Sequence, residues 1–117
     1  MLIFNNPDCS LCHLAEEHIA NDEKIQALLN IGKLNILAIT PDAEYDDWMK
    51  HKYPANWLVG YDMERNIYNH RLYDVQRLPC MYLLDKDKCV LLKEADYDRI
   101  SSYLSEIFPY DVMRTGQ

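Results

Sequence analysis

One stretch near the start of the chain decides its fold: Leu2-Ile3-Phe4-Asn5-Asn6-Pro7-Asp8-Cys9-Ser10-Leu11-Cys12. Its first residues are apolar and favour a short strand, which the turn-forming Asn6-Pro7-Asp8 ends. After it, residues suited to packing recur at the spacing of one helix face, namely Leu11, Leu14, Ala15, His18 and Ile19. We therefore expect Cys9 and Cys12 where the opening strand turns into a helix.

Strands and helices continue to alternate along the middle of the chain. The apolar residues 34–39 are typical of a buried strand, and residues 57–60 of a shorter one. Asp22 is suited to cap a second helical segment after the first. Thr40-Pro41-Asp42 has the composition of a further helix start, and Pro54 ends that helix.

The last part of the chain predicts a hairpin followed by a helix. Two apolar runs, at 81–84 and 89–92, flank the turn-like charged residues 85–88. Asp96 is suited to cap the final helix. The predicted order of elements is therefore β-α-β-α-β-β-α, which is an α/β fold.

The 117 residues of the chain, of which 49% are hydrophobic, fit one compact domain. We place this domain at 1–108 and a C-terminal tail at 109–117. The net charge of -7 repels phosphate backbones and anionic surfaces, so we expect neither nucleic acid nor a membrane as a partner of this domain. No stretch approaches the about 20 apolar residues of a membrane span, and the first residues carry no recognisable export signal, which leaves an excised domain open.

The C-x-x-C spacing of Cys9 and Cys12 has the clearest chemistry in the sequence. Two intervening residues let a small disulfide ring open and close with little backbone movement. Unpaired N–H groups and the dipole at a helix N-terminus favour a thiolate on Cys9, the expected nucleophile. Cys12, one turn further along, is suited to resolve the mixed disulfide. Asp8 opposes a charge on Cys9 and a protonated His13 favours it, and both effects stay open as redox tuning.

The order of elements, the C-x-x-C pair and residues 75–79 before the hairpin together resemble the thioredoxin superfamily over nearly the whole chain. Residues 6–9, 57–62 and 72–75 look most like the TlpA-type envelope thiol-disulfide oxidoreductases of that superfamily. The resemblance implies a thioredoxin-like three-layer sandwich, in which helices flank a central mixed sheet. It also implies that the chemistry requires no cofactor.

The same resemblance implies that Leu78 and Pro79 bind substrate. In this superfamily the proline before the hairpin is cis and packs beside the redox pair, and Leu78 would offer its backbone to an extended substrate peptide. Pro79 also lacks an N–H for sheet pairing, so it suits the first position of a strand. A cleft between Pro79 and Cys9 would let a substrate segment form backbone hydrogen bonds beside the nucleophile.

Four residues depart from the thioredoxin pattern. Ser10-Leu11 stands where thioredoxin has Gly-Pro, and Ile3 stands where thioredoxin buries an acidic residue. Cys80 follows Pro79 where many relatives carry Thr, and it is either a redox-tuning residue or a small buried hydrophobe. These departures leave the direction of electron flow open.

We expect a thiol-disulfide oxidoreductase, either a reductase or an isomerase, that acts on protein or peptide disulfides with an upstream thiol as electron donor or acceptor. The resemblance places it in the periplasm or cell envelope, with the cytoplasm as the alternative. The alternative function is a redox-inert thioredoxin-like module that docks a peptide. A zinc site would need Cys80 and Cys89, whose spacing does not fit, so we expect no metal. A peroxidase would need Thr or Ser at the position of Asn6.

Overall fold

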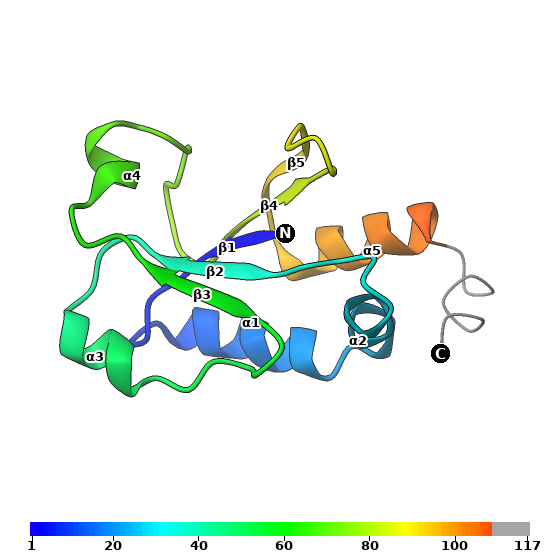
Figure 1. Cartoon of the computed structure of the whole chain (residues 1–117), viewed down its shortest axis with the longest axis horizontal. Helices are drawn as coiled ribbons and strands as arrows, with labels where there is room; N and C mark the ends of the chain where they lie inside the picture. The colour runs from blue at the N-terminus through cyan, green and yellow to red at the C-terminus, as the bar shows by residue number, and fades with distance from the viewer. Residues whose placement is uncertain (109–117) are drawn as a thin grey trace.

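Five strands of the described chain form one mixed sheet in the order β3-β2-β1-β4-β5 (Figure 1). The computed structural model describes residues 1–108, and its strands are β1 (Leu2–Phe4), β2 (Leu37–Thr40), β3 (Leu58–Tyr61), β4 (Cys80–Leu84) and β5 (Val90–Ala95). β2 lies parallel to both β1 and β3, whereas β4 runs antiparallel to β1 and β5. The tail predicted at 109–117 lies outside the described residues.

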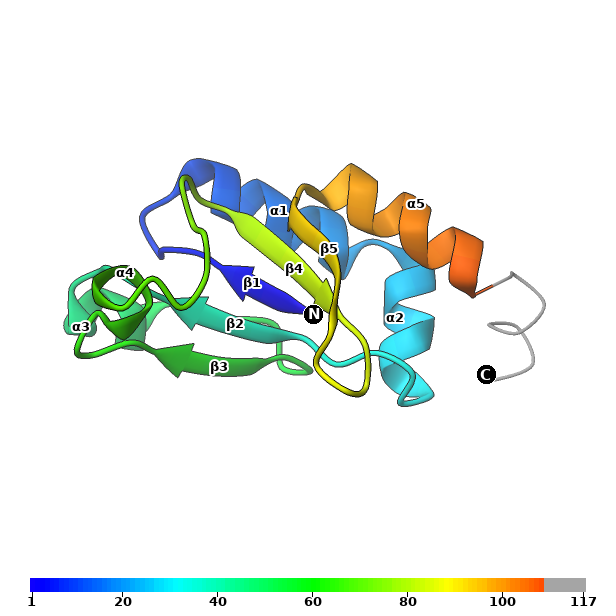
Figure 2. The ribbon, with the colours of Figure 1, turned by 90° about the horizontal axis from the view of Figure 1, so that it is seen from above.

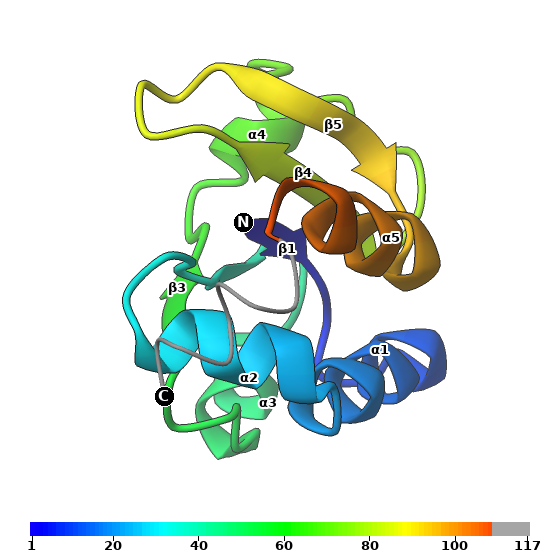
Figure 3. The same cartoon turned by 90° about the vertical axis from the view of Figure 1, so that its right-hand side faces the viewer.

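Helices cover both faces of this sheet. They are α1 (Ser10–Ala20), α2 (Glu23–Asn30), α3 (Tyr45–Lys50), α4 (Asn66–Asn69) and α5 (Tyr97–Ile107). α1, α2 and α5 contact one another, and Figures 2 and 3 show them gathered beside the sheet. α4 lies on the opposite side, above the sheet in Figure 1. This layering confirms the predicted α/β sandwich, and none of the helices within residues 1–108 has the length and apolar character of a membrane span.

Alternate residues of β4 enter two separate apolar clusters. Met81 and Leu83 belong to the larger cluster, which also contains buried residues of α1, α2 and α5. Cys80 and Tyr82 belong to the smaller cluster, together with Ile67 of α4. Because both faces of β4 are buried, its sequence is an unbroken apolar run, as is usual for a central strand covered on two sides.

Asp22 ties α2 to α5. Its carboxylate accepts the backbone N–H of Ile25 at 3.1 Å, and it accepts the hydroxyls of Tyr97 at 2.6 Å and Ser101 at 3.2 Å. Burial alone would raise the pKa of this carboxyl, but the hydrogen bonds outweigh burial and lower the pKa. The helix start predicted at Asp22 is confirmed, and the same side chain also joins two helices.

The helix start predicted at Thr40-Pro41-Asp42 is wrong. Thr40 is the last residue of β2, and α3 begins only at Tyr45. Thr suits both a helix cap and a strand, because it has a short hydroxyl and a β-branched side chain. Two tertiary contacts favour the strand: Thr40 pairs with Tyr61 of β3, and its hydroxyl lies 3.2 Å from that of Tyr53.

The predicted order β-α-β-α-β-β-α omits elements that the structure contains. The short strand expected at 57–60 exists as β3 and takes the edge of the sheet beside β2. Leu58 and Val59 of this strand are both exposed, so β3 lacks the alternation that marks a half-buried strand. The simplified order also leaves out two helices: α2, which is the second helical segment expected after Asp22, and α4, which lies near residues 63–68, where the sequence favours a turn or short helix.

Candidate functional site

Cys9 is the N-cap of α1, at the end of the loop that follows β1. Its sulfur accepts the backbone N–H of Cys12 at 3.1 Å, and its side chain is partly exposed. The N–H groups and the positive end of the dipole at a helix N-terminus stabilise negative charge at this place. Cys9 therefore combines access to solvent with surroundings that support a thiolate, as a nucleophilic cysteine requires.

Cys12 lies one turn into α1, and only 2% of it is exposed. Burial raises the pKa of its thiol to about 12, and the hydrogen bond and charge of Cys9 add to the rise. Both cysteines are free thiols. The two sulfurs therefore differ in access, since Cys9 can meet a substrate whereas Cys12 is shielded behind it.

The peptide bond between Leu78 and Pro79 is cis, as expected. The Leu78 carbonyl oxygen lies 3.9 Å from the Cys9 sulfur, across a separation of 69 residues in the sequence. The loop before β4 therefore lies against the N-terminus of α1. The structure thus brings together the residues predicted for exchange and substrate binding, which are Cys9, Cys12, Leu78 and Pro79.

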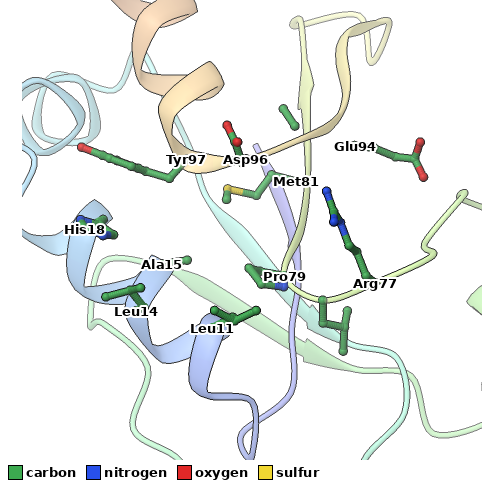
Figure 4. A pocket seen from close by; sticks show the side chains of 12 residues that line it. Leu11, Leu14, Ala15, His18, Arg77, Pro79, Met81, Glu94, Asp96 and Tyr97 are labelled. Atoms are coloured by element: carbon green, nitrogen blue, oxygen red, sulfur yellow. The ribbon is translucent and has the colours of Figure 1, made fainter.

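An apolar groove of about 250 Å³ extends from this meeting point along α1. Figure 4 shows Pro79 near its centre, Leu11 and Leu14 on the α1 side, and Arg77 with Glu94 at the opposite rim. Leu11 is 62% exposed and Leu14 48% exposed. The groove therefore offers accessible apolar side chains directly beside the cysteine pair.

The groove also corrects the predicted packing face of α1. Ala15 and Ile19 are buried in the larger cluster as expected, but Leu11 and Leu14 are not. These two leucines line the groove, as does His18, whose ring stacks on that of Tyr97 at 5.1 Å. The apolar face of α1 is wider than the part of it that packs against the core, so the rest of this face lines the groove.

Asp8 and His13 flank the cysteine pair differently. Asp8 is exposed to solvent. His13 hydrogen-bonds through Nε2 to the backbone carbonyl of Pro7, and its ring centre lies 5.0 Å from that of His51. His13 therefore braces the loop before Cys9 from the first turn of α1. Redox tuning by Asp8 or His13 stays a prediction.

Solved structures of Bacteroides proteins are similar to this chain over most of its length. A thioredoxin-like protein from Bacteroides caccae ATCC 43185 has 41% identity and a TM-score of 0.85 over 90% of this chain, which spans 39% of that protein. The C-terminal domain of an uncharacterized protein from Bacteroides fragilis NCTC 9343 has 40% identity and a TM-score of 0.85, over 89% of this chain and 76% of that one. A conserved Bacteroides fragilis protein of unknown function has 34% identity and a TM-score of 0.84, over 88% of this chain and 77% of that one.

The chain belongs to the family of these proteins, and its fold is thioredoxin-like. No family model matches the chain, and no curated protein does. The chain spans 39% of the length of the Bacteroides caccae protein. The expected TlpA-type activity stays a prediction.

Cys80 lies on the far side of the thioredoxin-like sheet from α1. It packs with Phe4 and Tyr82 in the smaller cluster, and its sulfur lies 3.8 Å from the carbonyl oxygen of Asp74. Burial raises the pKa of its thiol to about 11. Of the two readings of Cys80 that the sequence left open, this position fits a small buried hydrophobe and gives no contact with Cys9.

The four cysteines do not converge on one point. Cys89 is exposed in the turn of the β4–β5 hairpin, and Cys80 is buried on the far face of the sheet. Nowhere in residues 1–108 do three His, Cys, Asp or Glu side chains gather as a metal ion would need. The arrangement therefore gives no support to a zinc site built from Cys9, Cys12, Cys80 and Cys89.

A polar cluster behind Cys12 was not anticipated from the sequence. Glu16 of α1 hydrogen-bonds through Oε2 to Nε2 of His51 at 2.9 Å. The ring of Tyr53 packs edge-on against that of His51, with ring centres 4.4 Å apart. The available signal was the spacing of Glu16, four residues after Cys12, which puts both side chains on one side of the helix. His51 comes from the end of α3, and only tertiary structure brings it there.

Proposed function

We propose that the chain is a thiol-disulfide oxidoreductase, a reductase or isomerase, that exchanges disulfides with proteins or peptides. One geometric relationship carries the proposal: a partly exposed Cys9 at the N-terminus of α1 lies against the Leu78 carbonyl, with Cys12 buried one turn behind. Two thiols in this arrangement can act in sequence on one incoming disulfide. Neither step requires a cofactor.

The exchange proceeds through a mixed disulfide. The Cys9 thiolate attacks one sulfur of the substrate disulfide, the substrate S–S bond breaks, and the second substrate sulfur leaves and takes up a proton. Cys12 then loses its proton and attacks the Cys9 sulfur, so that the bond between Cys9 and the substrate breaks. The substrate leaves as a dithiol with two electrons gained, and the chain is left with a disulfide between Cys9 and Cys12. The same steps in reverse oxidise a substrate.

The groove supports a protein or peptide as the substrate. The Cys9 sulfur lies against the Leu78 carbonyl oxygen. An extended substrate segment that takes the place of this sulfur would donate a backbone hydrogen bond to the Leu78 carbonyl and hold its disulfide beside Cys9. Leu11 and Leu14 would receive an apolar side chain of that segment. Recognition that depends on backbone atoms and one apolar contact tolerates many substrate sequences.

The finer placement rests on the sequence resemblance. We propose a TlpA-type role in the periplasm or cell envelope, with an upstream thiol protein that supplies or removes electrons. The Bacteroides relatives share the fold and leave this role open.

A glutathione redox titration and an insulin reduction assay test the proposal together. The oxidoreductase account predicts a reversible disulfide between Cys9 and Cys12, located by mass spectrometry, and catalysed precipitation of insulin chains. Unchanged thiols across the titration, with an intact fold and a bound peptide in the groove, would instead support the redox-inert binding module.

A further inference from the structure

A partly buried polar pair lies one turn behind Cys12. Oε2 of Glu16 and Nε2 of His51 are 2.9 Å apart, and the two side chains are only 14% and 16% exposed. Glu16 follows Cys12 by four residues on α1, a spacing at which Cβ atoms lie about 5–6 Å apart. A carboxylate is therefore held close to the buried thiol.

Disulfide exchange requires Cys12 to lose a proton, and its surroundings oppose that loss. Burial raises the pKa of the Cys12 thiol to about 12, and the charge of Glu16 contributes to the rise. Transfer of the proton to Glu16 removes that repulsion, because the carboxylate becomes neutral as the thiolate forms. Cys12 and Glu16 are then never negatively charged at the same time.

The other titratable groups around Cys12 are already engaged. The hydroxyl of Tyr53 donates to Asn5 at 2.6 Å, and burial raises the pKa of Tyr53, which keeps its hydroxyl protonated. His13 bonds a backbone carbonyl of the loop before Cys9. Cys9 itself is bonded to the substrate at this stage. Glu16, with His51 behind it, is the group left to receive the proton.

We propose that Glu16, positioned by His51, accepts the proton of Cys12 when Cys12 resolves the mixed disulfide, an inference that rests on the proposed function. The proton moves from the Cys12 sulfur to the Glu16 carboxylate, the S–S bond between Cys12 and Cys9 forms, and the bond from Cys9 to the substrate sulfur breaks. The departing substrate thiolate takes up a proton from solvent. Glu16 then returns its own proton to solvent.

His51 acts as a positioning residue in this step. Its ring packs against those of His13 and Tyr53, with ring centres 5.0 Å and 4.4 Å away. These contacts hold Nε2 of His51 against both carboxylate oxygens of Glu16, at 3.2 Å and 2.9 Å. The Glu16 carboxylate is thereby fixed beside α1 instead of turning into solvent.

Stopped-flow reaction with the chromogenic disulfide 5,5′-dithiobis(2-nitrobenzoate) separates the two steps. All proteins carry Cys89→Ala and the Cys89→Ala protein serves as the wild type, because the exposed Cys89 thiol would otherwise release a coloured thiolate of its own. Attack by Cys9 releases one coloured thiolate, and resolution by Cys12 releases a second. For Glu16→Gln we expect a first phase within about twofold of the wild type and a second phase at least about tenfold slower at neutral pH. The second phase should recover as the pH rises, because hydroxide replaces the lost acceptor. Glu17→Gln, an exposed neighbour on the same helix, is the matched control and should leave both phases unchanged.

The outcomes separate this inference from the proposed function. A wild-type protein that shows no second phase contradicts the proposed function itself. Two normal phases in Glu16→Gln leave the function standing and overturn the role of Glu16. His51→Gln should slow the second phase and shift its pH profile while the first phase holds, and an unshifted profile would overturn the positioning role. If Glu16→Gln does not fold, Glu16→Asp provides the test, and its second phase must retain the wild-type pH profile at a reduced rate.

Discussion

The sulfur of Cys9 lies 3.9 Å from the carbonyl oxygen of Leu78, the residue before Pro79. This contact joins the first strand-to-helix junction to the loop that leads into β4. It also places the accessible thiol at the end of an apolar groove that Leu11 and Leu14 line. A peptide bound along that groove would therefore bring its disulfide to the thiol without a large movement of either segment.

Replacement of either cysteine should affect exchange differently. In Cys12→Ser the attack by Cys9 proceeds but resolution cannot, so covalent adducts with substrate proteins should accumulate. In Cys9→Ser the accessible nucleophile is absent and exchange should be lost. Non-reducing gels and intact mass spectrometry measure both outcomes. Exchange that persists in Cys9→Ser would overturn the assigned roles.

Truncation of Leu11 should weaken binding of peptide substrates without loss of stability. Leu11 is 62% exposed, so Leu11→Ala should change the free energy of unfolding by less than about 0.5 kcal/mol. The lost apolar contact should raise the KM for a protein disulfide about five- to tenfold, while the rate with a small chromogenic disulfide stays the same. Leu72→Ala is the matched control, because Leu72 is 60% exposed and does not line the groove. Equal effects of both variants on KM would contradict the proposal that the groove binds peptide substrates.

Loss of Asp22 should destabilise the fold in a pH-dependent way. Asp22→Ala removes a helix cap and leaves Tyr97 and Ser101 without their acceptor, so we expect a loss of about 2 kcal/mol at neutral pH. The folded pKa of Asp22 is below its ordinary value of 3.8, so its stabilisation is complete above that value and is lost as the pH falls through the folded pKa. Urea unfolding at a series of pH values measures the free energy of unfolding of both proteins. The difference in this free energy between wild type and variant should become smaller in acid. Asp98 is an exposed carboxylate in α5, and Asp98→Ala should show no comparable pH-dependent loss in the free energy of unfolding.

Cys80 should matter for stability and not for exchange. Cys80→Ala removes a buried sulfur from contact with Phe4 and Tyr82, at a cost of about 1 kcal/mol. Both phases of the reaction at Cys9 and Cys12 should keep their wild-type rates, because the sheet separates Cys80 from them. A changed reduction potential in this variant would show that Cys80 does tune the pair.

Local signals in the sequence predicted most of what positions the site. The turn residues Asn6-Pro7-Asp8 and the periodicity after them placed Cys9 at a helix start, and the structure has it as the N-cap of α1. Asp96 was expected to cap the last helix, and its side chain accepts the N–H of Arg99 there. These features depend on neighbours in the chain, so they can be recognised without the fold.

Features that depend on distant contacts could not be predicted in this way. Thr40 ends a strand because β3 pairs beside it, although its own residue type also suits a helix cap. Leu11 and Leu14 follow the helical period but face the groove, since the core covers only part of the apolar face of α1. His51 meets Glu16 through the packing of α3, across 35 residues of sequence. Each outcome is decided by the surface that an element packs against.

The most direct test of the central claim is a glutathione redox titration of a variant with Cys80 and Cys89 both replaced by Ala. With Cys9 and Cys12 as its remaining cysteines, this variant should show one reversible two-electron transition that matches the wild type. A chain that keeps both thiols across the full range of glutathione ratios while it remains folded would contradict the account.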